Sequence, residues 1–200
     1  MSQEPKSISI TGTNNRYQMR KLISQHKVEK EIKKRVASEN WAFSDECFTY
    51  YYQMNLINGV YKNGYQDTDE ISKTAIQEIN KKIYGYKQQD NLKKHYDNAN
   101  FITFESIIKK MIESELKCRY CKCEMSILYD VSREMKQWSV DRIDNDKGHN
   151  IDNFHLACLD CNLKRRRRTD DKFLFTKQLH IVKKDNETEN NETKDNDVRL

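Results

Sequence analysis

Long hydrophobic runs are missing from this 200-residue chain. No stretch of about 18 apolar residues occurs, so the sequence predicts no transmembrane helix and no membrane partner. The opening MSQEPKSISITGTNN also lacks the apolar segment of a secretory signal. We therefore expect an intracellular protein, cytoplasmic or nuclear, rather than a secreted one.

Apolar residues are scarce in general. The chain is 36% hydrophobic and 34% charged, and its mean hydropathy is −1.02. That is too polar for one well-filled core of this length. We expect part of the chain to stay unpacked or to be held by a metal ion.

The positive charge is unevenly distributed. The net charge is +5, but residues 185–200 hold six acidic and two basic residues, so the other 184 residues carry +9. A body this basic favours a polyanionic partner, most often nucleic acid.

The chain is predicted to divide into four parts. These are a flexible tail over 1–14, a helical and aromatic-rich region of unknown role over 15–100, a small domain over 101–184 that carries the motifs below, and a disordered acidic tail over 185–200. Apolar spacing predicts helices over 16–38 and over 69–86, with Gly85 as the stop of the second. A further helix should begin after Thr103, which is a good N-cap.

Six cysteines in a reducing compartment favour metal binding over disulfides. Four of them form two CxxC pairs: Cys118, Cys121, Cys158 and Cys161. Two such pairs complete a tetrahedral zinc site, and a closed shell of four thiolates is structural rather than catalytic. Cys123 is an alternative ligand, and Cys47 stands alone as a small core residue.

Residues 138–168 predict a compact unit. WSVDRI alternates as a strand does, DNDKGHNIDN is rich in turn residues, FHLAC is a second short strand, and LDCNLKRRRR is a helix that opens at the second CxxC pair. The zinc would clamp this helix to the chain before the first strand. The expected fold class is α+β, with a mostly helical N-terminal part followed by a small zinc-bound ββα domain.

This unit resembles the HNH (ββα-metal) endonucleases, most closely the zinc-stabilised branch of the phage endonuclease VII type. The resemblance covers about residues 103–168. Asp141 ends the first strand, Asn153 closes the loop, and Asn162 follows nine residues later at the start of the helix. The resemblance implies metal-dependent hydrolysis of phosphodiester bonds, with double-stranded DNA as the expected partner. It also implies that Asp141 and Asn162 hold a catalytic Mg²⁺ or Mn²⁺ ion and that Asn153 braces the loop. Carboxylate and amide oxygens are ligands that Mg²⁺ accepts.

The sequence departs from that family at Arg142, where most members have the His that activates water. Arginine stays protonated and cannot act as a general base. Three explanations stay open. His149 or His155 takes the proton, or metal-bound water needs no protein base while Arg142 contacts phosphate, or the chain binds DNA without cutting it.

Five consecutive basic residues, from Lys164 to Arg168, close the motif. We expect Lys164, Arg165, Arg166, Arg167 and Arg168 to contact the phosphate backbone, a salt-sensitive and sequence-independent interaction. A localisation signal is the runner-up, and a solvated helix end is the simplest alternative. The sequence leaves open DNA against RNA, the target, the mode of cutting, and whether the chain forms a homodimer. A protein-interaction adaptor is the third class of function.

Overall fold

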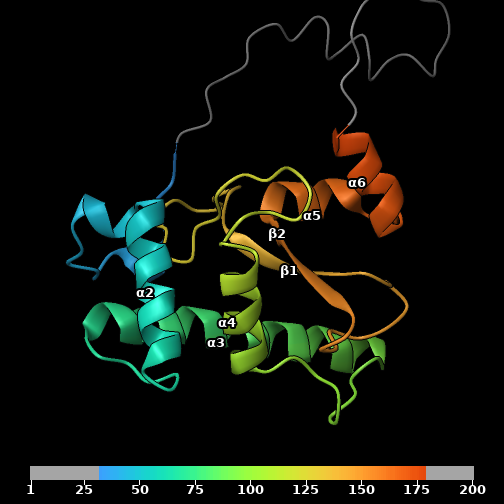
Figure 1. Cartoon of the computed structure of the whole chain (residues 1–200), viewed down its shortest axis with the longest axis horizontal. Helices are drawn as coiled ribbons and strands as arrows, with labels where there is room; N and C mark the ends of the chain where they lie inside the picture. The colour runs from blue at the N-terminus through green and yellow to red at the C-terminus, as the bar shows by residue number, and fades with distance from the viewer. Residues whose placement is uncertain (1–31, 179–200) are drawn as a thin grey trace, which may run out of the picture.

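Residues 32–178 are described in this computed structural model (Figure 1). The predicted tails over 1–14 and 185–200, and most of the helix predicted over 16–38, lie outside this range. Of that helix, the described part contains only a 3-10 turn, η2 (Val36–Ser38). Lys34 instead pairs with Val131, and the Arg35 amide donates to the Asp130 carbonyl. Residues 34 and 35 therefore pair with a segment nearly 100 residues later instead of continuing a helix.

Within residues 32–178, three α-helices precede the sheet. After a 3-10 turn, η3 (Asp45–Phe48), they are α2 (Tyr50–Lys62), α3 (Glu70–Lys93) and α4 (Phe104–Glu113). Two of them begin with capping boxes, in which Asp69 pairs with Ser72 and Thr103 pairs with Ser106. The predicted start of α4 after Thr103 is thus confirmed.

The predicted end of the second helix is wrong. The helix α3 continues through Gly85 to Lys93 and closes at Lys94, whose φ of 58° is left-handed. A glycine inside a helix costs only about 1 kcal/mol relative to alanine, so it does not stop a helix that packing supports. The segment after Gly85 therefore forms two further helical turns rather than a connection.

Both predicted strands are confirmed. The strands β1 (Trp138–Arg142) and β2 (Phe154–Cys158) pair antiparallel, with Val140 opposite Leu156 and Asp141 opposite His155. The helix α5 (Leu159–Arg165) follows directly and packs on both strands. A last helix, α6 (Asp170–Gln178), closes the described chain.

The expected helix over LDCNLKRRRR is shorter than predicted. It ends at Arg165, because Arg166 has a φ of 54°, outside the helical region. The remaining arginines consequently form an irregular segment between α5 and α6. The mixed architecture of helices and one small antiparallel sheet agrees with the predicted α+β class.

One hydrophobic core joins the helices to the sheet. Its buried members include Ile57 of α2, Ile79 of α3, Ile108 of α4, and Trp138 and Leu156 of the sheet. Figure 1 shows α3 running along one side of the molecule, past α2 and α4, to the loop between β1 and β2. The division expected at residue 100 therefore separates segments that share a core. No helix within residues 32–178 is long and apolar enough to cross a membrane.

Candidate functional site: a cysteine cluster beside a buried carboxylate

The four cysteines of the two CxxC pairs lie together. Their Sγ atoms are all within 4.8 Å of one another: Cys118, Cys121, Cys158 and Cys161. The Sγ atoms of Cys121 and Cys158 are 3.8 Å apart. A tetrahedron with Zn–S bonds of roughly 2.3 Å places its sulfurs roughly 3.8 Å apart. The cluster is thus compatible with a metal ion such as zinc, and Cys123 lies outside it.

The thiols affect one another's ionisation. A hydrogen bond from Cys158 lowers the pKa of Cys118 to about 4, whereas the same contact raises the pKa of Cys158. Burial raises the pKa of Cys161 to about 12, and the charge on Cys118 adds to this. Four thiolates this close repel one another, so they ionise together only around a cation. Cys47, away from the cluster, is buried, as expected of a core residue.

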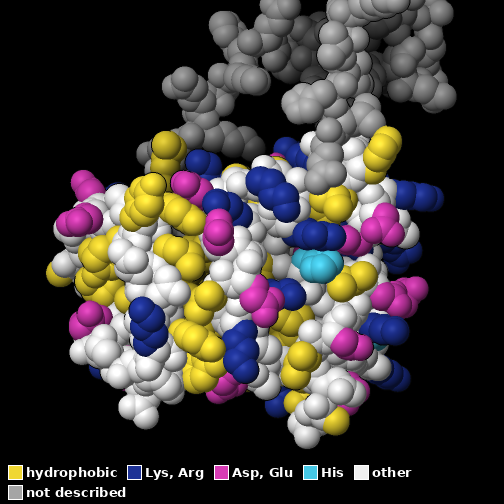
Figure 2. All heavy atoms as spheres, in the orientation of Figure 1, with side chains coloured by type: hydrophobic (Ala, Val, Ile, Leu, Met, Phe, Trp, Pro, Cys, Tyr) yellow, Lys and Arg dark blue, Asp and Glu magenta, His cyan; other side chains and the backbone are white. Residues whose placement is uncertain are grey.

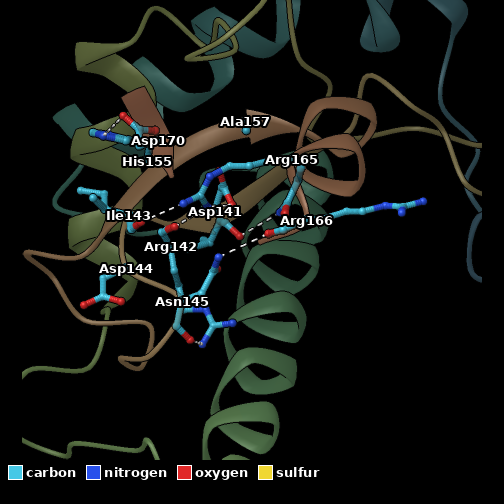
Figure 3. Close-up of polar contacts among 12 residues, drawn as sticks. Asp141, Arg142, Ile143, Asp144, Asn145, His155, Ala157, Arg165, Arg166 and Asp170 are labelled. Carbon is cyan, nitrogen blue, oxygen red and sulfur yellow. Dashed lines mark hydrogen bonds and ion pairs between the residues drawn. The ribbon is translucent and has the colours of Figure 1, made fainter. Parts of the chain in front are cut away.

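Asp141 is buried and paired. It is 5% exposed, and its Oδ1 accepts a hydrogen bond of 2.8 Å from Nη1 of Arg165. The guanidinium of Arg165, itself 1% exposed, also donates to the carbonyl oxygens of Arg142 and Ile143 (Figure 3). This side chain therefore ties α5 to the end of β1 through a carboxylate and two backbone groups.

Tyr120 lies on the other side of the same carboxylate. Its hydroxyl contacts Oδ2 of Asp141 and lies 2.7 Å from Oδ1 of Asp170, the first residue of α6. One hydroxyl hydrogen cannot serve two ionised carboxylates at once, so one of the two contacts favours a protonated carboxyl group. Burial raises the pKa of Asp141, although Tyr120 and Arg165 both oppose that shift.

The two expected asparagines are both placed by hydrogen bonds. Asn162 donates through Nδ2 to Oγ of Ser139 and to the carbonyl of Val140, which fixes the start of α5 against β1. Asn153 accepts from the amide of Asp144 and donates to the carbonyls of Asp144 and Gly148. Asn153 thus connects two points of the loop between β1 and β2 by hydrogen bonds, as a residue that braces this loop would do.

Asp141 and Asn162 line one cavity of about 400 Å³ between α3, β1 and α5. A larger cleft of about 750 Å³ adjoins it, and Arg142 and Arg166 line both. The basic lining of the larger cleft consists of Lys93, Arg142, Arg165, Arg166, Arg167 and Arg168. Asp144 and Asp146 also line this cleft. On the face shown in Figure 2, basic and acidic side chains are likewise interspersed.

Two of the five residues expected to contact phosphate have other partners in this structure. Arg165 borders the larger cleft but is only 1% exposed, because its guanidinium is paired with the buried carboxylate of Asp141. Lys164 is exposed, but it lines neither of these two cavities and pairs with Asp160 at 2.7 Å, one helical turn earlier. Arg166, Arg167 and Arg168 are exposed and remain at the cleft.

Arg142 stiffens the loop from within. Its Nη1 donates to the carbonyls of Asn145 and Lys147, at 3.1 and 2.8 Å. The side chain is half-buried and borders both cavities. A guanidinium at that border can attract a phosphate, but it cannot accept a proton from water.

The donor atoms suit Mg²⁺ in kind, since Asp141 offers carboxylate oxygens and Asn162 an amide oxygen beside one cavity. The charge balance opposes an ion there. Each carboxylate oxygen of Asp141 already accepts a hydrogen bond, and Arg165 already neutralises the group. A divalent ion at this position would have to compete with a buried guanidinium.

The two histidine candidates have different surroundings. His149 is 4% exposed, lines the cavity shared by Asp141 and Asn162, and pairs through Nδ1 with Oδ1 of Asp90 at 2.7 Å. His155 is half-buried, lies 3.7 Å from Asp170, and borders a different cavity. Of these two histidines, only His149 therefore lines the same cavity as the expected metal ligands.

Gly148 allows the loop to reach α3. A Cβ atom here would lie 2.4 Å from the carbonyl oxygen of His95 and 2.9 Å from Oδ2 of Asp90. We expect Gly148→Ala to lower the free energy of unfolding by about 1–3 kcal/mol, because a backbone carbonyl cannot move aside freely. Urea unfolding measures this.

The matched control is Gly85→Ala, within α3. A Cβ atom at Gly85 meets nothing within 4 Å, so alanine there should stabilise the protein by about 0.5–1 kcal/mol. Equal effects of the two substitutions would show that the contact at Gly148 carries no energetic weight.

Sequence reasoning missed three residues of the site. Tyr120 lies inside the first CxxC pair, Asp170 begins α6, and Asp90 lies in the last turns of α3. Asp90 contacts a residue 59 positions away. Of the three, only Tyr120 had a local signal, since it is enclosed by two expected zinc ligands.

Comparison of the chain with protein-family models, with curated proteins and with solved structures found no match.

Proposed function

We propose that this chain is a metal-dependent endonuclease of the HNH type that hydrolyses DNA phosphodiester bonds. The observation that carries the proposal is the shared cavity of Asp141 and Asn162, one residue from each of β1 and α5. The cysteine cluster at the start of α5 supports it, because a zinc ion there would hold the helix against the sheet.

Each part of the proposed site has a task. A Mg²⁺ or Mn²⁺ ion held by Asp141 and Asn162 would neutralise the charge that develops on the phosphate. Asn153 holds the loop that carries the cavity wall. Arg166, Arg167 and Arg168 would contact the phosphate backbone along the adjoining cleft.

A second candidate is a zinc-stabilised module that binds DNA without cutting it. The ion pair between Arg165 and Asp141 favours this function, because the carboxylate that should hold the metal is already neutralised. The basic cleft would serve both functions equally, so it does not choose between them.

Incubation of the zinc-loaded protein with supercoiled plasmid and Mg²⁺ or Mn²⁺ separates the two. We expect nicked or linear plasmid, and we expect a chelator of the added ion to stop its formation. Asp141→Asn, which removes the charge and keeps the shape, should lower cleavage by at least about 100-fold.

A wild-type protein that shifts plasmid on a gel but never cuts it would support the binding module instead. A protein that fails to bind DNA at moderate salt would favour an adaptor that binds other proteins.

A further inference from the structure

We propose that Asp90 and His149 form a base dyad, in which Asp90 of α3 orients His149 so that its Nε2 takes the proton from the attacking water. This inference rests on the proposed nuclease function. It assigns to α3, which the sequence left without a role, the positioning residue of the site.

Both carboxylate oxygens of Asp90 contact His149, one at the ring and one at the backbone. Oδ1 of Asp90 lies 2.7 Å from Nδ1 of His149, and Oδ2 accepts the backbone N–H of the same residue at 2.6 Å. Asp90 is 0% exposed. Because a carboxylate only accepts hydrogen bonds, Nδ1 must carry the hydrogen, and Nε2 of the neutral ring keeps its lone pair.

Tyr86 fixes the plane of the ring. Its ring stacks on His149 with the centroids 4.6 Å apart, and its hydroxyl accepts the backbone N–H of Val140 at 3.0 Å. Tyr86 therefore links the ring of His149 to the backbone of β1 at Val140, one residue before Asp141. Gly148 permits this approach, because a Cβ atom there would meet the carbonyl oxygen of His95 and the side chain of Asp90.

The position of the ring matches the task. His149 lines the cavity of about 400 Å³ together with Asp141, Arg142 and Asn162. Arg142, at the position where the resemblance leads one to expect a histidine, cannot accept a proton. The general base would thus be His149, in the loop between β1 and β2, and Asp90 of α3 would hold its ring in place.

The charges around the ring set its titration. Burial lowers the pKa of His149, Asp90 opposes this, and Arg142 and Lys93 lower it further. Tyr86, which stacks on the ring, has its pKa raised to about 12 by burial and stays uncharged near neutral pH. A lowered pKa leaves the ring neutral, and able to accept a proton, at neutral pH.

The proposed step balances. One proton of water moves to Nε2 of His149, and the water oxygen forms a bond to phosphorus. The bond between phosphorus and the leaving oxygen breaks, and that oxygen takes a proton from solvent. His149 then releases its own proton to solvent, which restores the neutral ring.

The first test is plasmid cleavage by His149→Ala, measured with Mg²⁺ and Mn²⁺ on zinc-loaded protein. We expect the rate to fall by about 100- to 10,000-fold, the usual contribution of a general base. Added imidazole should restore part of the rate, which it would not do for a purely structural defect.

The second test is the pH profile of Asp90→Asn. The wild-type rate should rise with pH and level off once His149 is neutral. Loss of the Asp90 charge lowers the pKa of His149 further, so the acidic limb should move to lower pH while the plateau falls by about 10-fold or more. A defect in folding would lower the plateau and leave the limb in place.

A third readout needs no activity. Long-range ¹H–¹⁵N NMR of the wild-type ring should show the hydrogen on Nδ1 at neutral pH, and Asp90→Asn should lower the ring's measured pKa. The opposite tautomer would overturn the dyad.

The outcomes separate the two proposals. If wild-type protein cuts plasmid and His149→Ala cuts within about threefold of it, the dyad is wrong and the nuclease stands. If His155→Ala abolishes cleavage and His149→Ala does not, the base is on β2. A wild-type protein that never cuts overturns both proposals.

Discussion

Cys161→Ser should lose its metal ion and, with it, the cooperative folding of the sheet and α5. Cys161 is fully buried, and its Sγ belongs to a cluster whose members lie within 4.8 Å of one another. A serine hydroxyl is a poor zinc ligand, and a site of three thiolates holds the ion far less tightly. Structural zinc contributes apparent binding energies of about 10–16 kcal/mol in small metal-bound domains. Metal analysis and circular dichroism measure the two losses.

Cys123→Ser is the matched control. Cys123 lies two residues after Cys121 and is half-buried. Its thiol interacts with those of Cys121 and Cys158, but it is not one of the four sulfurs that group within 4.8 Å of one another. This variant should keep about one zinc ion per chain and a melting curve close to that of wild type. If Cys123→Ser lost the metal and Cys161→Ser kept it, the assignment of the four ligands would be wrong.

Arg165→Met should be the most damaging substitution outside the cluster. It leaves the buried carboxylate of Asp141 without a counter-charge and removes the donor to the carbonyls of Arg142 and Ile143. Breaking one partner of a buried ion pair costs about 3–5 kcal/mol, because the remaining charge stays in a poorly solvated site. The shift of the urea midpoint of zinc-loaded protein gives this loss.

Lys164→Met is the control for Arg165→Met, because it removes a basic residue from an exposed ion pair instead of a buried one. Lys164 pairs with Asp160 at 2.7 Å, yet both side chains are at least a third exposed, so this pair should contribute less than about 1 kcal/mol. Equal losses for the two variants would mean that Arg165 acts only as one more surface charge. The double variant Arg165→Met with Asp141→Leu should recover part of the loss, since it removes the stranded charge as well.

Local patterns predicted the two strands and the grouping of the cysteines. The alternation within WSVDRI and FHLAC predicted two strands, and both are present, although four of the five residues in each strand are buried. The two CxxC pairs predicted the cysteine cluster, because short turns bring the thiols of each pair together whatever surrounds them. Asp141 and Asn162 line one cavity, because the strand β1 and the helix α5 that carry them pack directly against each other.

The errors came from features that local patterns do not encode. Gly85 was expected to end a helix, but packing along the core carries α3 eight residues past it. The five basic residues from Lys164 to Arg168 were expected to lie on one helix and to contact phosphate. Their charges instead divide among a buried ion pair, a surface pair and the cleft, because Arg166, whose φ is 54°, ends α5 in the middle of the run.

By itself, the sequence determined which groups are available: four thiols in two turns, a carboxylate at the end of a strand, and amides at the loop and the helix start. These follow from residue type and short spacing. Only the tertiary structure decided the state of those groups. Arg165 is 24 residues from the carboxylate it neutralises, and Asp90 is 59 residues from the imidazole it orients. Contacts between distant residues depend on how the whole chain packs, and no local pattern of residues specifies them.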